Sequence, residues 1–527
     1  MTLARIAHHV RLRSRQLARC GVVGWESILA DLTGELRSIP IQRLAPNALA
    51  QPGRGRGERC GLLALCCIAT LALCACHAGP RYEPPRDEMP AEWSAAVAVD
   101  DAPPEEWWKT FQDPVLDSLI ERAVRSNVEL DVAVARVDEA RALADVARGG
   151  ARPRVDAAAS YARERASGNT PQGSFVSGEH DVFRVGLDAA WEIDFFGRNA
   201  RAVEAADASL DAERERAHAV LVRLLGEVAR IYVELRGAQR DIQLVNDSLV
   251  LSRDTLQLNR ARFEAGLASE LDVARAESFV ATTEAELPAL DARVRQSIHA
   301  LGVLLGSQPS ALVEELSRAA EIPRPAARIA AGVPSELARR RPDIGAAERE
   351  LASATALEGA AVADLFPRIV LTGSLGRESE DLGDLFDASS RVWSVGPSIV
   401  APIFRGGELR ANVRVHEARV EQARGRYRQT VLVALREVED ALAAWTHELG
   451  RLRALELAER SDARSVELAS ALYERGLVDY FEVLDAQRTQ LTTRSDVARA
   501  RVTLASAAIA LYKALGGGFE DRWPRDG

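Results

Sequence analysis

Few side chains of this 527-residue chain have the types and spacing that catalysis needs. The eight histidines are scattered without metal-ligand spacing, and no glycine-rich phosphate-binding loop is present. All six cysteines lie within the first 76 residues, which excludes a disulfide framework, a cysteine zinc site or a cysteine nucleophile in the rest of the chain. We therefore expect that the protein is not an enzyme and that it uses no cofactor or metal.

The residue with a recognisable modification chemistry is Cys76. Three arginines precede an apolar run over residues 61–73, whose 13 residues are too few to span a bilayer as a helix but match the core of a signal peptide. The run ends in Leu-Cys-Ala-Cys, which resembles the bacterial lipobox, whose final cysteine is acylated. We expect residues 1–75 to be a signal region, in which a mis-assigned translation start would account for the unusual length of residues 1–53. We expect Cys76 to be acylated, with palmitate among the attached fatty acids. A buried apolar segment is the alternative, and His77 favours outer-membrane sorting.

Charge is distributed unevenly along the chain. It has 67 Lys and Arg against 77 Asp and Glu, and beyond residue 75 the counts are 57 and 73, a net charge of −16. A mature chain this acidic repels nucleic acid. The aromatic share of 5% favours long alanine-rich helices over a bulky core.

The sequence contains an internal repeat, so the elements that position the functional residues are expected to occur twice. Residues 262–267 (RFEAGL) are echoed 210 residues later by 472–477 (LYERGL), and the same offset pairs Gly197 with Gly407. Upstream the offset is 214, because residues 153–155 (PRV) match 367–369 (PRI). We expect a lipidated segment over 76–118, a first repeat over 119–306, a connecting segment over 307–332, a second repeat over 333–516 and a tail over 517–527.

Each repeat contains two candidate strands. Residues 181–195 alternate between apolar side chains at odd positions and polar or charged ones at several even positions, and a counterpart runs from Trp393 to Ile403. Shorter alternating stretches begin at Val155 and Ile369, which gives four strands in two hairpins. Segments of about ten residues with one apolar face match transmembrane β-strands, whereas four strands among so much helix make a poor soluble sandwich.

Each hairpin is followed by a long helix. No proline occurs between Gly197 and Gly266 or between Gly407 and Gly476, so each stretch can form one helix of about 100 Å. Apolar residues in the second stretch recur at heptad spacing from Val431 to Leu452. Return helices are expected over 271–305 and 481–515, with Pro288 interrupting the first.

Four transmembrane strands cannot close a barrel alone, so the barrel must be shared between subunits. The motifs Trp107-Trp108, Asp113-Pro114, Arg341-Pro342-Asp343-Ile344, Phe366-Pro367-Arg368 and Pro402-Ile403-Phe404-Arg405-Gly406-Gly407 resemble the outer-membrane factors of tripartite efflux systems, lipoproteins of the TolC and NodT type.

The resemblance implies a mixed α and β membrane protein. In this fold a homotrimer forms a 12-stranded outer-membrane β-barrel that continues into a 12-helix periplasmic α-barrel, and the connecting segment over 307–332 is equatorial, part of a belt around that α-barrel. It also implies a lipid-anchored protein of the bacterial outer membrane that works with a periplasmic adaptor (membrane-fusion) protein and an inner-membrane RND-type transporter. The expected function is the exit channel for small molecules such as drugs. An exit duct for type I protein secretion and a non-conducting envelope protein remain alternatives.

The resemblance also assigns roles to the two turns after the long helices. Gly266-Leu267 and Gly476-Leu477 are the expected tips that dock the adaptor, although a glycine that merely ends a helix is the alternative. Glu482 and Asp485 share one helix face and, with Asp272, are the expected acidic periplasmic gate. Arg275 and Arg475 are the candidate compensating cations, and the competing interpretation is that the acids only complement the dipole of a return helix.

Overall fold

The computed structural model describes residues 78–85, 89–90, 92–94, 104–165, 167, 178–326, 328–329 and 332–518. The signal region, Cys76 and the tail beyond residue 518 therefore lie outside the described residues. The chain divides into two compact units. Unit 1 comprises Met1–Glu83, Leu143–Asp207 and Ala352–Gln422, and unit 2 comprises Pro84–Ala142, Ala208–Leu351 and Ala423–Gly527.

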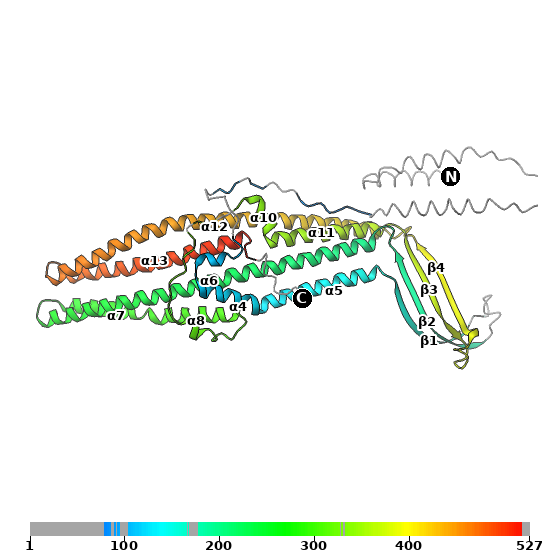
Figure 1. Cartoon of the computed structure of the whole chain (residues 1–527), viewed down its shortest axis with the longest axis horizontal. Coiled ribbons are helices and arrows are strands. Elements are labelled where there is room, and N and C mark those ends of the chain that lie inside the picture. Colours follow the sequence, from blue (N-terminus) through cyan, green and yellow to red (C-terminus); the bar gives the residue numbers. More distant parts are fainter. Residues whose placement is uncertain are drawn as a thin grey trace, which may run out of the picture. The chain divides into compact units, whose positions relative to one another are not determined.

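Unit 1 contains one antiparallel sheet in the order β1-β2-β3-β4 (Figure 1). Its strands are β1 (Arg154–Arg165), β2 (Glu179–Ile193), β3 (Arg368–Ser379) and β4 (Arg391–Val400). The pairing runs without a bulge across all three interfaces, so Ala157, Leu187, Leu375 and Trp393 stand in one row.

Two strand predictions need correction. The strand expected to reach Ile403 ends at Val400, because Pro402 cannot donate to a ladder. The strands expected to be shorter, β1 and β3, have 12 residues each, which is fewer than the 15 of β2 but more than the 10 of β4. The consecutive alanines from Ala157 to Ala159 hid the alternation in β1, because alanine occupies both faces there.

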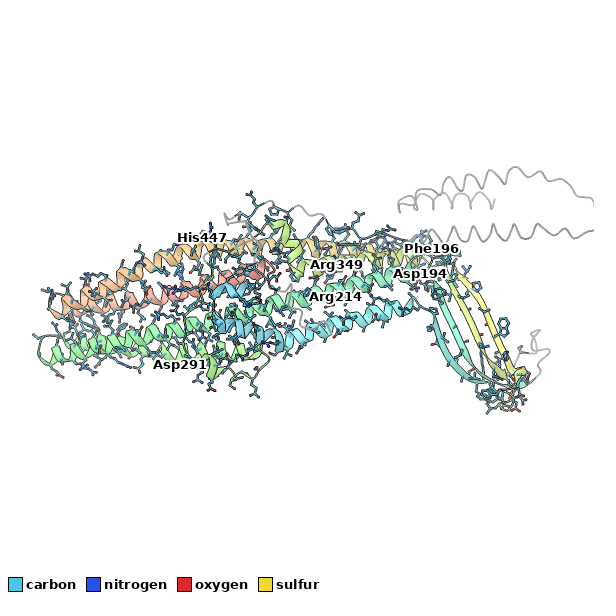
Figure 2. The ribbon with its side chains drawn as sticks, in the orientation of Figure 1. Asp194, Phe196, Arg214, Asp291, Arg349 and His447 are labelled. Carbon is cyan, nitrogen blue, oxygen red and sulfur yellow. The ribbon has the colours of Figure 1, made fainter. Side chains whose placement is uncertain are left out.

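The two long helices are present as predicted. α6 (Arg198–Glu264) and α12 (Glu408–Glu474) have 67 residues each, which corresponds to about 100 Å. At the end of β2, Asp194 accepts a hydrogen bond from the backbone nitrogen of Ala200 at 2.7 Å and so satisfies a free amide in the first turn of α6 (Figure 2).

The return helices lie beside the long helices as antiparallel partners (Figure 1). α12 is bridged to α13 (Tyr480–Ala514) by Glu456 and Arg501 at 3.0 Å. The first return segment is broken, as expected, into α7 (Glu270–Glu284) and α8 (Leu287–Leu304), with Pro288 in the first turn of α8. Proline fits there because a first-turn amide has no partner within the helix.

The remaining elements are short or flank these helices. They are η2 (Trp107–Phe111), α4 (Pro114–Ser126), α5 (Val128–Gly150), α9 (Val313–Leu316), α10 (Pro334–Arg340), α11 (Pro342–Ala363) and η3 (Ala388–Ser390). None of the helices in the described part of the chain combines the length and apolar character that crossing a membrane requires.

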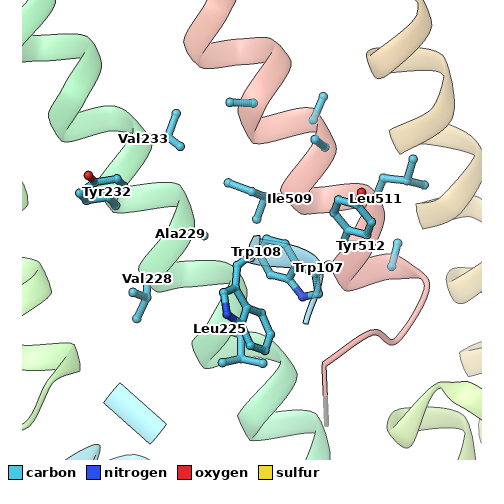
Figure 3. Close-up of a cluster of buried hydrophobic side chains, with 14 of the residues drawn as sticks. Trp107, Trp108, Leu225, Val228, Ala229, Tyr232, Val233, Ile509, Leu511 and Tyr512 are labelled. Carbon is cyan, nitrogen blue, oxygen red and sulfur yellow. The ribbon is translucent and has the colours of Figure 1, made fainter. Parts of the chain in front are cut away.

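The core of unit 2 forms where η2 meets apolar side chains of α6 and α13. Trp107 and Trp108 are almost fully buried, and Trp107 stacks on Tyr512 of α13 at 5.3 Å between ring centroids (Figure 3). Tyr232 of α6 donates a hydrogen bond to Asp113 Oδ2 at 2.8 Å, while Asp113 Oδ1 caps α4 by accepting from the amide of Val115 at 2.9 Å. The Asp113-Pro114 motif therefore starts α4 and fastens it to α6.

In each repeat, a side chain at the same repeat position donates a hydrogen bond to a carbonyl at the end of the return helix. Asn127 Nδ2 donates to the carbonyl of Leu304 at the end of α8, at 2.8 Å. At the equivalent place in the second repeat, Arg341 Nη1 donates to the carbonyl of Ala514 at the end of α13, at 3.0 Å. These bonds satisfy carbonyls that a helix end would otherwise leave unpaired. Arg341 also pairs with Asp343 and Glu437, at 2.7 and 2.8 Å.

Candidate functional site: sheet faces and hairpin tips

The sheet of unit 1 has one apolar face. Because the register is unbroken, odd-numbered residues of all four strands share this face, and most of them are large and apolar. Many of these side chains are exposed although they are hydrophobic, for example Leu187 at 50% and Val395 at 69%. A face of this kind in a water-soluble sheet would need a covering layer.

The even-numbered face of the same sheet is polar. Asp156 lies directly opposite Asp188, whose other neighbour is Ser374 on β3. Arg184 approaches Asp188 at 3.9 Å, and the Oγ atoms of Ser374 and Ser394 are 2.8 Å apart. This face presents hydroxyl groups and charges of both signs, as expected of a wall that contacts water.

The turns predicted as tips have the same backbone geometry in both repeats. Gly266 and Gly476 adopt φ values of 71° and 75°, a region that side chains disfavour. The amide of Leu267 donates to the carbonyl of Arg262 at 2.7 Å, and the amide of Leu477 donates to that of Leu472 at 2.9 Å. These bonds make each turn a Schellman C-terminal cap.

The leucines of these caps do not pack on their own helices. In a Schellman cap the residue after the glycine commonly makes an apolar contact with the last helical turn. Here Leu267 and Leu477 are 69% and 67% exposed in the single chain. Both tips therefore offer a large apolar side chain to a partner.

Asp272 is engaged in a local structural role. Its carboxylate accepts hydrogen bonds from the backbone nitrogen and Oγ of Ser269, at 3.1 and 2.7 Å, and completes a capping box at the start of α7. The structure thus gives Asp272 a capping role that the sequence analysis did not name, and its expected part in a gate stays a prediction.

Glu482 and Asp485 are placed differently from Asp272. Both are exposed on one face of the first turns of α13, where Asp479 rather than either of them caps the helix. In the described part of the chain neither carboxylate forms an ion pair. Arg275 of α7 lies over the ring of Phe481, the residue before Glu482, at 5.9 Å, and Arg475 is exposed at the end of α12. The structure therefore gathers the predicted acids and bases around the tips without pairing them.

A buried polar network behind the tips was missed by sequence reasoning. Tyr473 Oη donates to Asn259 Oδ1 at 2.6 Å, and Arg262 Nη1 donates to the carbonyl of Tyr473 at 2.9 Å. Gln487 Nε2 donates to Thr255 Oγ1 at 3.1 Å. The signal was available, because Thr255, Asn259 and Arg262 recur at spacings of four and three, which place them on one face of α6.

Burial keeps the aromatic hydroxyls at the tips protonated. It raises the pKa of Tyr480 to about 12. Burial also raises the pKa of Tyr473, against the opposing charge of Arg262. Neither tyrosine titrates at neutral pH, so pH sensitivity at the tips has to come from other groups.

Comparison with known proteins decides the family. The model of the family described as "Outer membrane efflux protein" matches residues 119–307 and again residues 333–517. The chain belongs to the outer membrane efflux protein family. Nodulation protein T of Rhizobium leguminosarum bv. trifolii is 32% identical over 457 residues, which cover 85% of this chain and 96% of that protein.

Two further relatives agree with this assignment. The toluene efflux pump outer membrane protein TtgI of Pseudomonas putida is 33% identical over 86% of this chain and 97% of its own length. A solved structure of the outer-membrane channel OprN superposes with a TM-score of 0.80 at 36% identity, covering 84% of this chain and all of that one.

Membership fixes the architecture in which the two faces and the tips operate. The outer membrane efflux protein described here is the outer-membrane exit channel of an efflux pump, as predicted from the sequence motifs. It is a homotrimer in which three four-stranded sheets close one barrel, and it acts with an adaptor protein and an inner-membrane RND pump.

Proposed function

We propose that the channel releases small organic molecules, including drugs and solvents, from a tripartite pump to the exterior. The observation that carries this proposal is the two-faced sheet, whose apolar odd-numbered face suits lipid and whose polar even-numbered face suits a water-filled duct. The relative TtgI, named for a toluene efflux pump, supports an organic substrate rather than an exported protein. The duct supplies a path, and substrate selection falls to the inner-membrane pump.

The tips at Gly266-Leu267 and Gly476-Leu477 are the proposed docking points for the adaptor. Their support is the exposure of both leucines on rigid glycine turns. A buried apolar anchor in a partner's pocket is the usual source of binding energy at a protein interface.

The proposed gate consists of Glu482 and Asp485 from each subunit, with Asp272 in a lesser role because its carboxylate already caps α7. Threefold symmetry turns each acid into a ring of like charges, which attracts cations and resists closure unless basic groups compensate. Arg275 and Arg475, close to these acids in sequence and at the same tips, are the proposed compensating groups.

Lipidation of Cys76 is the proposed second attachment to the membrane. Ala78, two residues after this cysteine, donates its amide hydrogen to the carbonyl of Phe196 at 3.0 Å, just after β2 ends (Figure 2). This contact holds the chain at the helix-proximal end of the sheet, where an acyl chain reaches the inner leaflet of the outer membrane. We further propose that the protein conducts without catalysing a reaction.

The docking proposal is tested by an export assay in a strain that depends on this channel. Leu267→Asp with Leu477→Asp should abolish export of an organic dye and adaptor crosslinking while trimers remain. Leu267→Met with Leu477→Met is the matched control and should retain both, because it preserves an apolar anchor. Unchanged export and crosslinking in the aspartate variant would remove the docking role.

A further inference from the structure

The loop end of the second hairpin carries an arginine pair that conduction does not explain. Arg377 of β3 and Arg391 of β4 are direct Cα partners, and both lie on the apolar, odd-numbered face. Like charges directly opposite each other on neighbouring strands destabilise a sheet. Neither arginine forms an ion pair with a carboxylate among the described residues, so the described part of one subunit supplies no counter-charge at this position.

The first hairpin provides an internal comparison. By the repeat offsets of 214 and 210, Arg377 corresponds to Arg163 and Arg391 corresponds to Asp181, and these two are likewise direct Cα partners. Arg163 pairs with Glu179 at 3.2 Å. The equivalent pair in the first hairpin is thus balanced by acids. The fold accepts an acid at this position, and the arginine pair is a property of the second repeat alone.

Apolar side chains flank the arginine pair both on the sheet and in the loop that follows β3. One step toward the middle of the sheet, the partners Leu375 and Trp393 are 57% and 67% exposed. Beyond the pair, Arg377 Nη1 donates to the carbonyls of Phe386 and Asp387, and its guanidinium lies 6.0 Å from the ring of Phe386, which is 70% exposed. Tryptophan next to basic groups is typical of the level where lipid headgroups meet acyl chains.

We propose that Arg377 and Arg391 bind the phosphate of an anionic lipid headgroup in the outer leaflet. The hairpin loops are the ends of the strands opposite the helices, so in an outer-membrane barrel this row faces the external leaflet. A guanidinium fork matches phosphate geometry, and the guanidinium of Arg391 donates no hydrogen bond to the described part of its own subunit. A lipid is favoured over dissolved phosphate because the exposed Leu375 and Trp393 continue the surface that acyl chains cover.

This inference rests on the outer-membrane fold and not on what the pump exports. Its test is the association of spin-labelled lipid with the purified trimer in vesicles, with an anionic headgroup compared with a zwitterionic one. Arg391→Asp reproduces the arrangement of the first hairpin and should therefore fold. We expect it to lower the preference for the anionic lipid by at least about fivefold per site, the effect of losing one basic residue at an anionic surface.

Two further arms separate the alternatives. Arg163→Gln, at the equivalent place in the first hairpin, should leave the preference for the anionic lipid unchanged. If Arg391→Asp does not assemble, Arg391→Gln replaces it and should also lower this preference. Inorganic phosphate should displace little of the labelled lipid. A wild-type preference in the Arg391 variants, an equal loss in Arg163→Gln, or full displacement by inorganic phosphate would each overturn the proposal. Export of dye is recorded in parallel, because its loss would concern the pump and not the headgroup site.

Discussion

An arginine at Leu187 should destabilise the barrel, whereas an arginine at the next residue should not. Leu187 lies on the apolar face in a row with Ala157 and Leu375, six residues from Ile193 at the end of β2. At about 3.4 Å per residue and a tilt near 45°, six residues rise roughly 14 Å, which is about half of a 25 Å apolar band. Leu187 therefore lies near the bilayer midplane.

The expected cost of Leu187→Arg is about 2–4 kcal/mol per subunit, a shift of roughly 30- to 700-fold in the folding equilibrium. Asp188→Arg is the matched control, since its side chain lies on the polar face opposite Asp156 and should change stability by less than about 1 kcal/mol. Urea unfolding in lipid vesicles and the yield of SDS-resistant trimer measure both effects. Equal tolerance or equal loss at the two positions would refute the assignment of the faces.

Three other predictions concern separate parts of the molecule. Cys76→Ser should abolish metabolic labelling with a fatty acid and impair sorting, but it should spare assembled trimers because one acyl chain binds a membrane only weakly. Label that persists in this variant would exclude the cysteine as the acylation site. Combined Glu482→Ala and Asp485→Ala should remove block by multivalent cations in planar-bilayer recordings, and retained block would rule out the acidic gate. Tyr232→Phe should lower the free energy of unfolding by about 1 kcal/mol. Asp113→Ala should lower it by about 2–4 kcal/mol, because this change removes a helix cap and leaves the buried hydroxyl of Tyr232 without an acceptor. A double-mutant cycle in which the two effects simply add would show that their hydrogen bond contributes nothing.

The long elements were predictable because glycine and proline mark where they end. α6 and α12 begin after Gly197 and Gly407 and end two residues before Gly266 and Gly476, as the absence of proline between these positions indicated. The break before Pro288 followed from the same reasoning. Strand β2 was found within two residues of its predicted bounds, because its alternation is strong.

The contacts that were not predictable join residues far apart in the sequence. The bonds from Asn127 to Leu304 and from Arg341 to Ala514 span 177 and 173 residues, so no local pattern reveals them. The buried polar network that includes Thr255 and Asn259 was overlooked because heptad analysis searches for apolar side chains. For Asp272 the sequence offered a gating role or a favourable interaction with the helix dipole, and its hydrogen bonds to Ser269, which cap α7, were not predicted.

The two equivalent hydrogen bonds at the ends of the return helices bear on how many chains are needed to build the channel. The hydrogen bond of Asn127 joins two residues of the first repeat, and that of Arg341 joins two residues of the second. Neither repeat therefore depends on the other for this contact. A ring assembled from single-repeat chains would need six chains, whereas a ring of the two-repeat chain needs three. Fusion of two copies reduces five associations to two, and each association costs on the order of 4–15 kcal/mol of lost translational and rotational freedom. The tandem gene thereby lowers the concentration at which a complete ring forms.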